Sequence, residues 1–188
     1  MMSNTASVSD AGHTPRPPVL LHRIFRGVDG LLAPYRQIDE NPARALLSEQ
    51  ALVLFQSMSK ADRAHSLRVL HWLQAQGYRQ PDLLVAGLLH DCGKAEAKLA
   101  VWQRTLKVLL KSFLPRAWFW LARPAAPHSW RYPFYILHIH PQLGAQKALA
   151  AGCSELTAWL IAGHERRPDP LHPHYPLMRA LQDADGSC

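Results

Sequence analysis

The chain has 188 residues, of which 48% are hydrophobic and 19% are charged, and this composition excludes a wholly disordered protein. Its length predicts a single domain. Lys and Arg number 21 against 14 Asp and Glu, so the formal net charge is +7, and the chain also carries 11 histidines. The cysteines at 92, 153 and 188 are spaced too widely to indicate a disulfide framework or a thiolate metal site.

The N-terminal region differs in composition from the rest of the chain. Residues 1–18 are rich in Ser, Thr and Pro, and no charged region is followed there by an apolar one, so no secretory signal is predicted. We interpret 1–18 as a flexible leader and 19–188 as one helical domain. The reducing compartment indicated by the unpaired cysteines makes the cytoplasm the expected location.

The rest of the sequence is typical of an all-α protein. Leu and Ala recur at helical spacing, alternating β-branched residues are few, and proline clusters mark breaks between helices. One or two helices are expected within 19–57, interrupted around Pro34 and Pro42. Further helices are predicted at about 60–76, 81–90, 99–114, 141–152, 154–164 and 176–185, with Pro141 opening the fourth of these.

A basic, aromatic segment follows residue 96. No Asp or Glu occurs from 97 to 154, where eight Lys and Arg lie together with six Trp and Phe between 102 and 130. On the helix predicted at 99–114, the basic face is Arg104, Lys107 and Lys111, and the apolar face is Leu106, Leu109, Leu110 and Phe113. The apolar face would pack on the bundle with a solvated basic rim, or the segment 99–131 would contact an anionic membrane or nucleic acid. No transmembrane segment is expected, because the charges at 107, 111 and 116 interrupt the apolar run.

The strongest chemical signal is His90-Asp91-Cys92-Gly93-Lys94, at the end of an apolar helix. The adjacent imidazole and carboxylate can reach one metal ion, and Gly93 permits a turn. Lys94 can approach a substrate phosphate as a point charge, although a lysine after a turn is also often simply solvated.

Other candidate ligands lie far from this motif in the sequence. His65 and His164 lie on the inward faces of their predicted helices, and His140 immediately precedes another helix, with His138 as the alternative to it. Asp185 continues an apolar stripe four residues after Leu181, so it is preferred to Asp183. The remaining candidates are interpreted as ordinary core or surface histidines: His71, His128, His172 and His174.

Together, His65, His90-Asp91 and Asp185 resemble the HD superfamily of metal-dependent phosphohydrolases, whose helical bundles hold a divalent metal on these four positions. The resemblance covers about 46–188, with 97–133 as a basic insertion. The stretches His140-Pro141-Gln142-Leu143-Gly144 and Gly163-His164-Glu165-Arg166-Arg167 are similar to the His-Pro-x-x-Gly and His-His-Glu segments of the HD-GYP branch and its HDIG-type relatives. The resemblance therefore implies His140 and His164 as ligands of a second metal, bridged to the first by Asp91.

The chain also departs from that branch. Gly163 stands where the first histidine of the His-His-Glu pair is expected, and 167–171 lack the Gly-Tyr-Pro signature. Ala61 offers no carboxylate one turn before His65, so no third metal is expected.

These observations predict an enzyme that hydrolyses a nucleotide-like phosphomonoester or phosphodiester through a metal-activated water. One or two divalent ions are expected, and imidazole and carboxylate ligands without thiolate suit Mn, Fe, Co, Ni or Zn. Asp91 and Lys94 are the candidate catalytic residues, with Lys94 on the substrate phosphate. Two alternatives stay open: a membrane- or nucleic-acid-binding module with a regulatory or inactive HD core, and an HD protein that binds a nucleotide or metal without hydrolysing it.

Overall fold

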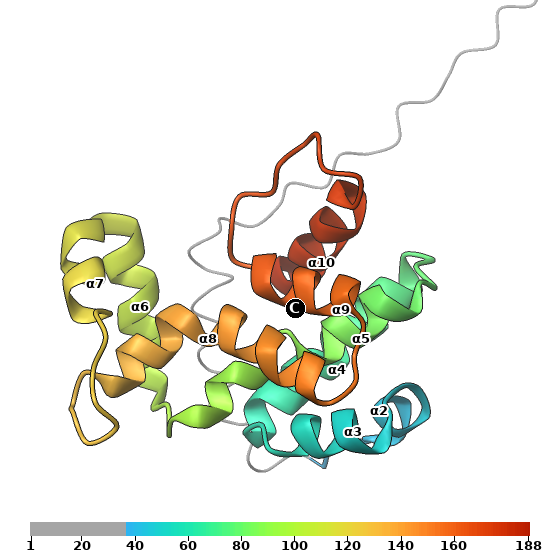
Figure 1. The fold of residues 1–188 in the computed structure, drawn as a ribbon, viewed down its shortest axis with the longest axis horizontal. Helices are drawn as coiled ribbons and strands as arrows, with labels where there is room; N and C mark the ends of the chain where they lie inside the picture. The colour runs from blue at the N-terminus through green and yellow to red at the C-terminus, as the bar shows by residue number, and fades with distance from the viewer. Residues whose placement is uncertain (1–36) are drawn as a thin grey trace, which may run out of the picture.

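The computed structural model describes residues 37–188, and all of the regular elements within this range are helices (Figure 1). The prediction of an all-α fold is therefore confirmed. The leader predicted at 1–18, and the break predicted at Pro34, lie outside the described residues. No helix among residues 37–188 combines the length and the apolar character needed to cross a membrane.

The helix boundaries follow local signals in the sequence. Ser48, Ser59 and Ser154 each accept a hydrogen bond at a helix N-terminus from the backbone amide three residues later. Prolines lie in the first turn of five helices, where their missing amide has no partner to lose. The elements in chain order are α2 (Asn41–Leu46), α3 (Glu49–Gln56), α4 (Lys60–Ala75), α5 (Pro81–Leu89), the 3-10 helix η2 (Cys92–Glu96), α6 (Val101–Phe113), α7 (Pro115–Leu121), α8 (Tyr132–Ala150), α9 (Glu155–Gly163) and α10 (Tyr175–Ser187).

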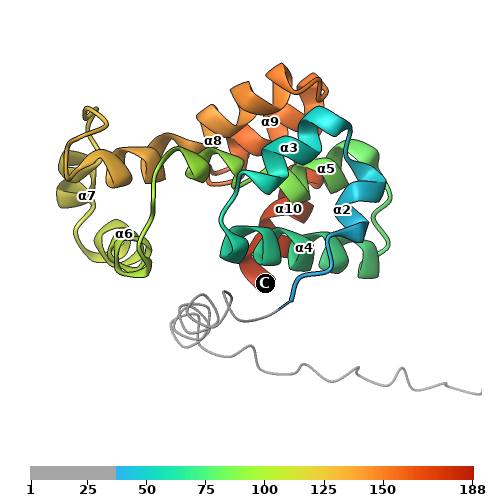
Figure 2. The same ribbon diagram turned by 90° about the horizontal axis from the view of Figure 1, so that it is seen from below.

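The main core fills the space between α4, α5, α9 and α10, with α3 and the second half of α8 packed around it (Figure 2). Leucines and isoleucines meet there without solvent exposure, among them Leu70 and Leu73 of α4, Leu88 of α5, Ile161 of α9 and Leu181 of α10. The ends of α5 and α9 reach this core, so it fixes the positions of the residues that follow each helix.

Helix α8 begins much earlier than the sequence predicts. It starts at Tyr132, so Pro141 lies inside the helix and does not open it. The prediction was wrong because Pro133 already supplies a first-turn proline, and the apolar spacing continues through Phe134 and Leu137, which are buried. A proline inside a helix destabilises it, because a backbone hydrogen bond is lost.

Helices α6 and α7 form a hairpin that projects from the first half of α8, away from the rest of the bundle in both views (Figures 1 and 2). A second, small core joins the three helices: Trp118, Leu121, Ala122, Phe134 and Leu137, with Leu99, Leu106 and Leu110 packed against it. The predicted orientation of α6 is wrong in part. Its basic face is directed at the bundle, where Arg104 and Lys107 form ion pairs, whereas Leu109 and Phe113 of the apolar face are exposed.

Gly93 and Gly144 lie where η2 and α8 approach each other most closely. A Cβ atom added at Gly93 would lie 2.1 Å from the carbonyl oxygen of His140, and one added at Gly144 would lie 3.2 Å from the amide nitrogen of Gly93. Neither glycine has a positive φ, since among the described residues only Gly77 and Gly152 do. Gly93 is therefore needed for backbone contact between two elements and not, as expected, for a turn.

Replacing Gly93 by alanine should destabilise the protein, because the new methyl group would meet backbone atoms of α8 that cannot rotate away. We expect the free energy of unfolding, measured by urea titration, to fall by at least about 1–3 kcal/mol. Gly186→Ala is the matched control, since nothing lies within 4 Å of its added Cβ and it lies in helix α10. An equal effect of both substitutions would contradict the role assigned to Gly93.

Candidate metal centre

Six His and Asp side chains meet at the centre of the bundle in two adjacent groups. His65, His90 and Asp185 form one group, and Asp91, His140 and His164 form the other, with candidate ligand atoms within 4.8 Å of one another in each group. All six are residues that the sequence predicts as metal ligands. Five of them are buried, and Asp185 is half-buried.

Each of the six comes from a position that the fold controls. His65 projects from α4, His140 from α8 and Asp185 from α10, whereas His90 and His164 lie directly after the last residues of α5 and α9. Asp91 lies between His90 and the first residue of η2. The two groups adjoin, because the His90 ring centroid lies 5.3 Å from that of His65 and 5.1 Å from that of His164.

The residues that the sequence sets aside lie elsewhere. His138 is exposed and lies edge-on to Trp118 and Phe119, while Asp183 forms an exposed ion pair with Arg179 at 3.0 Å. The other histidines within residues 37–188 also lie outside both groups: His71, His128, His172 and His174.

Three of the four clustered histidines are oriented by the same device. The Nδ1 atoms of His90, His140 and His164 lie 3.0, 3.0 and 2.7 Å from the backbone carbonyl oxygens of Gly87, Leu137 and Ile161, each three residues earlier. A carbonyl only accepts hydrogen bonds, so Nδ1 carries the proton and donates in each pair. This directs Nε2 of each ring at the cluster, with a lone pair whenever the ring is neutral, which is the usual arrangement of metal-binding histidines.

This device requires a carbonyl that no helical amide occupies. In a continuous helix, the carbonyl three residues before a histidine accepts from the amide that follows the histidine. For His90 and His164 the helix has just ended, so the carbonyl is one of the last, unpaired ones. His140 lies inside α8, but the next residue is Pro141, which has no amide hydrogen and leaves the carbonyl of Leu137 to the imidazole.

The donor set fits a bound cation. The Nε2 atoms of His90 and His140 are buried and make no hydrogen bond within residues 37–188. A buried polar atom without a partner is rare, because its desolvation costs about 1–3 kcal/mol. Two such atoms, beside the carboxylates of Asp91 and Asp185, make a set of imidazole and carboxylate ligands that suits a divalent transition metal.

The protonation states at neutral pH also fit a cation. Burial and the neighbouring His90 lower the pKa of His164 to about 3, and burial also lowers the pKa of His65 and His140. Burial opposes the charge of His90, yet Asp91 and Asp185 raise its pKa to about 9. Three imidazoles are therefore neutral, while the two carboxylates favour a positive charge between them.

Asp91 connects the two groups. Its Oδ1 lies 3.4 Å from His140 Nε2 and 3.8 Å from His164 Nε2, whereas its Oδ2 lies 3.5 Å from His90 Nε2. The Nζ atom of Lys94 donates to the same Oδ2 at 2.6 Å. Although burial disfavours both charges, this pairing lowers the pKa of Asp91 well below its ordinary value and raises that of Lys94. Lys94 is thus fixed at the centre and is not a solvated surface lysine.

Five further charged residues surround the cluster and are absent from the predicted site. Glu165 Oε1 lies 3.8 Å from His140 Nε2 and accepts from Lys107, and its Oε2 accepts from Lys111 at 3.2 Å. Asp62, nearly fully buried on α4, pairs with both terminal nitrogens of Arg104, one of them at 2.8 Å. The sequence gives a signal for Glu165 alone, through its place in the segment similar to His-His-Glu. The ion pairs with α6 join residues that are distant in sequence, so no local pattern indicates them.

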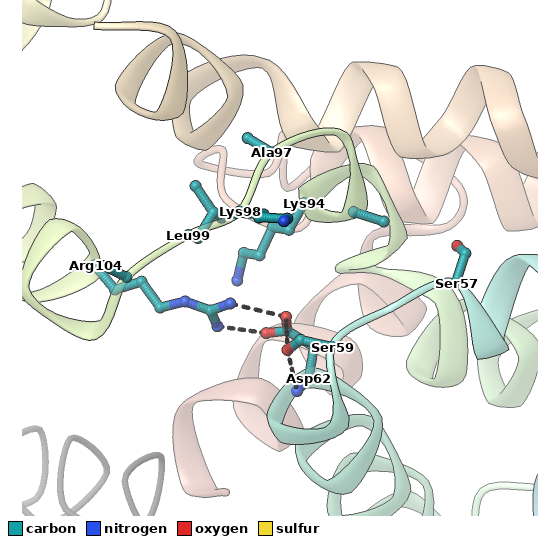
Figure 3. Close-up of a pocket in the computed structure, with 10 residues that line it drawn as sticks. Ser57, Ser59, Asp62, Lys94, Ala97, Lys98, Leu99 and Arg104 are labelled. Atoms are coloured by element: carbon teal, nitrogen blue, oxygen red, sulfur yellow. Dashed lines mark hydrogen bonds and ion pairs between the residues drawn. The ribbon is translucent and has the colours of Figure 1, made fainter. Parts of the chain in front are cut away.

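A cavity of about 500 Å³ lies beside the cluster and has Lys94 in its wall (Figure 3). Its polar lining comprises Ser57, Ser59 and Asp62 on one side, with Lys94, Lys98 and Arg104 as the cations. Since Lys94 also contacts Asp91, one side chain links the cavity to the six clustered residues. The volume is within the usual range for small-molecule sites.

The fold and the cluster thus define an all-α protein with a candidate centre for divalent metal ions. No protein-family model, no curated protein and no solved structure matches the chain. Function is therefore inferred from the chemistry of the chain's own residues.

Pro141→Ala tests how His140 is oriented. The new amide would compete with the imidazole for the carbonyl of Leu137, and we expect the affinity for Mn²⁺ or Zn²⁺ to fall about 10–100-fold, as for other losses of a ligand's hydrogen-bond partner. The metal-free protein should instead become more stable, by up to about 3 kcal/mol, since an interior proline is removed. Calorimetric metal titration and urea unfolding measure the two effects. Weaker binding with lower stability would indicate general damage and contradict the explanation.

Arg104→Gln tests the ion pair of α6 with Asp62. It should lower the free energy of unfolding at pH 7 by about 2–4 kcal/mol, because a buried carboxylate loses its partner. The loss is reduced by solvent screening, since 30% of the Arg104 side chain is exposed. Burial opposes the charge of Asp62, but Arg104 lowers its pKa in the native protein, so this stabilisation is present at neutral pH and is lost as the pH falls below about 4.

The pH dependence separates this explanation from simple loss of packing. The deficit of Arg104→Gln should shrink as Asp62 becomes protonated, and Asp62→Asn combined with Arg104→Gln should recover part of the stability at pH 7. A deficit that is the same at pH 7 and at about pH 2, below the pH at which the ion pair is lost, would contradict the ion-pair explanation.

Proposed function

We propose that this protein is a metal-dependent phosphohydrolase that acts on a nucleotide-like phosphomonoester or phosphodiester. The observation that carries the proposal is the convergence of six His and Asp side chains from five helices, with two buried Nε2 atoms lacking hydrogen-bond partners in the described part of the chain. The resemblance of the same residues to the HD superfamily supports it. The four core positions are His65, His90, Asp91 and Asp185, and the second set adds His140 and His164.

Two metal ions are proposed, with Asp91 shared between them. Its two oxygens face different histidines, Oδ1 towards His140 and His164 and Oδ2 towards His90, which suits a bridging carboxylate. A bound divalent metal lowers the pKa of a coordinated water to near neutrality and neutralises negative charge that develops on a phosphoryl group. The absence of thiolate from the donor set favours Mn, Fe, Co, Ni or Zn.

Lys94 is proposed to position both Asp91 and the substrate. Its ammonium group donates to Asp91 Oδ2, and the same side chain lines the neighbouring cavity. A phosphate group entering from that cavity would meet Lys94, with Lys98 and Arg104 close by. Lys98 forms no ion pair within residues 37–188, so it favours an anionic substrate, and the volume of the cavity is within the range of small-molecule sites.

The direct experiment combines metal analysis with a substrate panel. The full chain would be stripped with a chelator, refilled separately with each of the five metals, and assayed on nucleoside monophosphates and on linear and cyclic dinucleotides. We expect bound metal by elemental analysis and turnover that disappears in Asp91→Asn. No metal above background, or turnover that persists in Asp91→Asn, would overturn the proposal.

Two pairs of substitutions separate loss of a ligand from general damage. Asp185→Asn and His140→Gln should each reduce turnover more than about 100-fold, because each removes a direct metal ligand. Asp183→Asn and His138→Gln alter neighbouring residues on the same helices that are exposed and outside the cluster, and should stay within about twofold of the unaltered protein. Equal losses within a pair would contradict the assigned ligands.

A further inference from the structure

The surface of the α6–α7 hairpin is unusually apolar. Among residues 37–188, every exposed Phe or Trp side chain lies between 102 and 130, and Phe113 and Trp130 are exposed by 71% and 67%. Together with exposed aliphatic residues they make an apolar surface, which comprises Trp102, Val108, Leu109, Phe113, Leu114, Phe119, Trp120 and Trp130. Exposed apolar groups gathered in this way usually mark a binding surface.

The hairpin does not need this surface for its own folding. Its core is made of other residues, among them Trp118 and Leu121 of α7 and Leu106 of α6, which pack on the first half of α8. Trp102 and Trp130 lie edge-on to Phe134 of that core and yet stay largely exposed. On α6, Trp102, Leu109 and Phe113 follow one another at helical spacing on a different stripe. Both views show the hairpin projecting from the bundle (Figures 1 and 2).

The charges around the apolar surface are positive. Arg116, Arg123 and Arg131 belong to the stretch 97–154, which contains no Asp or Glu, and none of the three forms an ion pair with any residue from 37 to 188. The guanidinium group of Arg131 lies 5.7 Å from the ring centroid of Trp120. Aromatic side chains next to uncompensated arginines are typical of segments that lie at the surface of an anionic membrane.

We propose that the α6–α7 hairpin, with Trp130, binds peripherally to the surface of an anionic phospholipid bilayer. Exposed aliphatic side chains such as Leu109 and Leu114 favour this over nucleic acid, since bases stack on aromatic rings and not on leucine. Arg104 and Lys107, which would otherwise track a polyanion, are instead held in ion pairs with Asp62 and Glu165. The hairpin thus turns its paired charges to the bundle and its apolar side chains outward.

This arrangement would hold the candidate metal centre close to the bilayer. The same helix α6 presents apolar side chains on its outer side and contacts Asp62 and Glu165 on its inner side, next to the cavity and the clustered histidines. Binding to lipid does not depend on hydrolysis, so it can be tested on protein with or without metal.

Vesicle co-sedimentation of the full chain tests the proposal. We expect binding to phosphatidylcholine–phosphatidylglycerol vesicles that weakens with salt, and much weaker binding to pure phosphatidylcholine. Phe113→Ser combined with Phe119→Ser and Trp120→Ser should reduce the partition coefficient at least about 30-fold. The matched control removes three exposed apolar side chains elsewhere, at Val53, Leu149 and Leu171, and should leave binding unchanged.

A second pair of variants tests the charges. Arg116→Gln with Arg123→Gln should weaken binding to the anionic vesicles about 20-fold or more, whereas Arg44→Gln with Arg68→Gln, which remove exposed charges outside the hairpin, should have little effect.

Three results would overturn the proposal. The first is a lack of binding to anionic vesicles at low salt. The second is binding to single-stranded oligonucleotides, lost in the aromatic variant, without binding to vesicles. The third is a dimer in light scattering that the aromatic variant dissociates, again without vesicle binding.

Discussion

The candidate metal centre depends on the availability of three backbone carbonyls. His90, His140 and His164 each donate from Nδ1 to the carbonyl three residues earlier, and this is possible only where the helical hydrogen-bond ladder is interrupted. Two interruptions are helix ends that the main core holds in place. The third is Pro141, which removes a backbone hydrogen bond from helix α8. It lies at the position where this leaves a carbonyl free for a buried imidazole. The points where the helical hydrogen bonds are interrupted therefore determine the geometry of the site.

Ion pairs between distant segments complete the site. Asp62 on α4 and Glu165 after α9 are both close to the cluster, and both are paired with cations of α6. Helix α6 is thereby fixed with its charges inward, and its remaining stripe is left exposed at the end of the molecule. The proposed enzyme site and the proposed lipid-binding surface thus result from one orientation of one helix. Close packing of Gly93 against α8 keeps Asp91 beside His140 in the same region.

Much of this could be predicted from local sequence patterns. Serine caps and first-turn prolines are short-range signals, so the boundaries of α4 and α5 were predicted to within about one residue. The six clustered residues were also identifiable: inward positions on predicted helices indicate His65 and Asp185, the end of an apolar helix indicates His90 and Asp91, and the resemblance to the HD-GYP segments implies His140 and His164. Their convergence is observed in the structure, whereas their role as metal ligands stays a prediction.

What the pattern could not reveal are interactions through space. Local rules penalise an interior proline and therefore predict Pro141 at a helix start, whereas the contact between His140 and Leu137 explains its position inside α8. The orientation of α6 was wrong in part because amphipathicity defines two faces without saying which one meets the bundle. The buried carboxylate of Asp62 on α4 and the partly exposed Glu165 after α9 decided it. An unpaired buried charge costs more free energy than exposed apolar side chains, so the basic face turned inward.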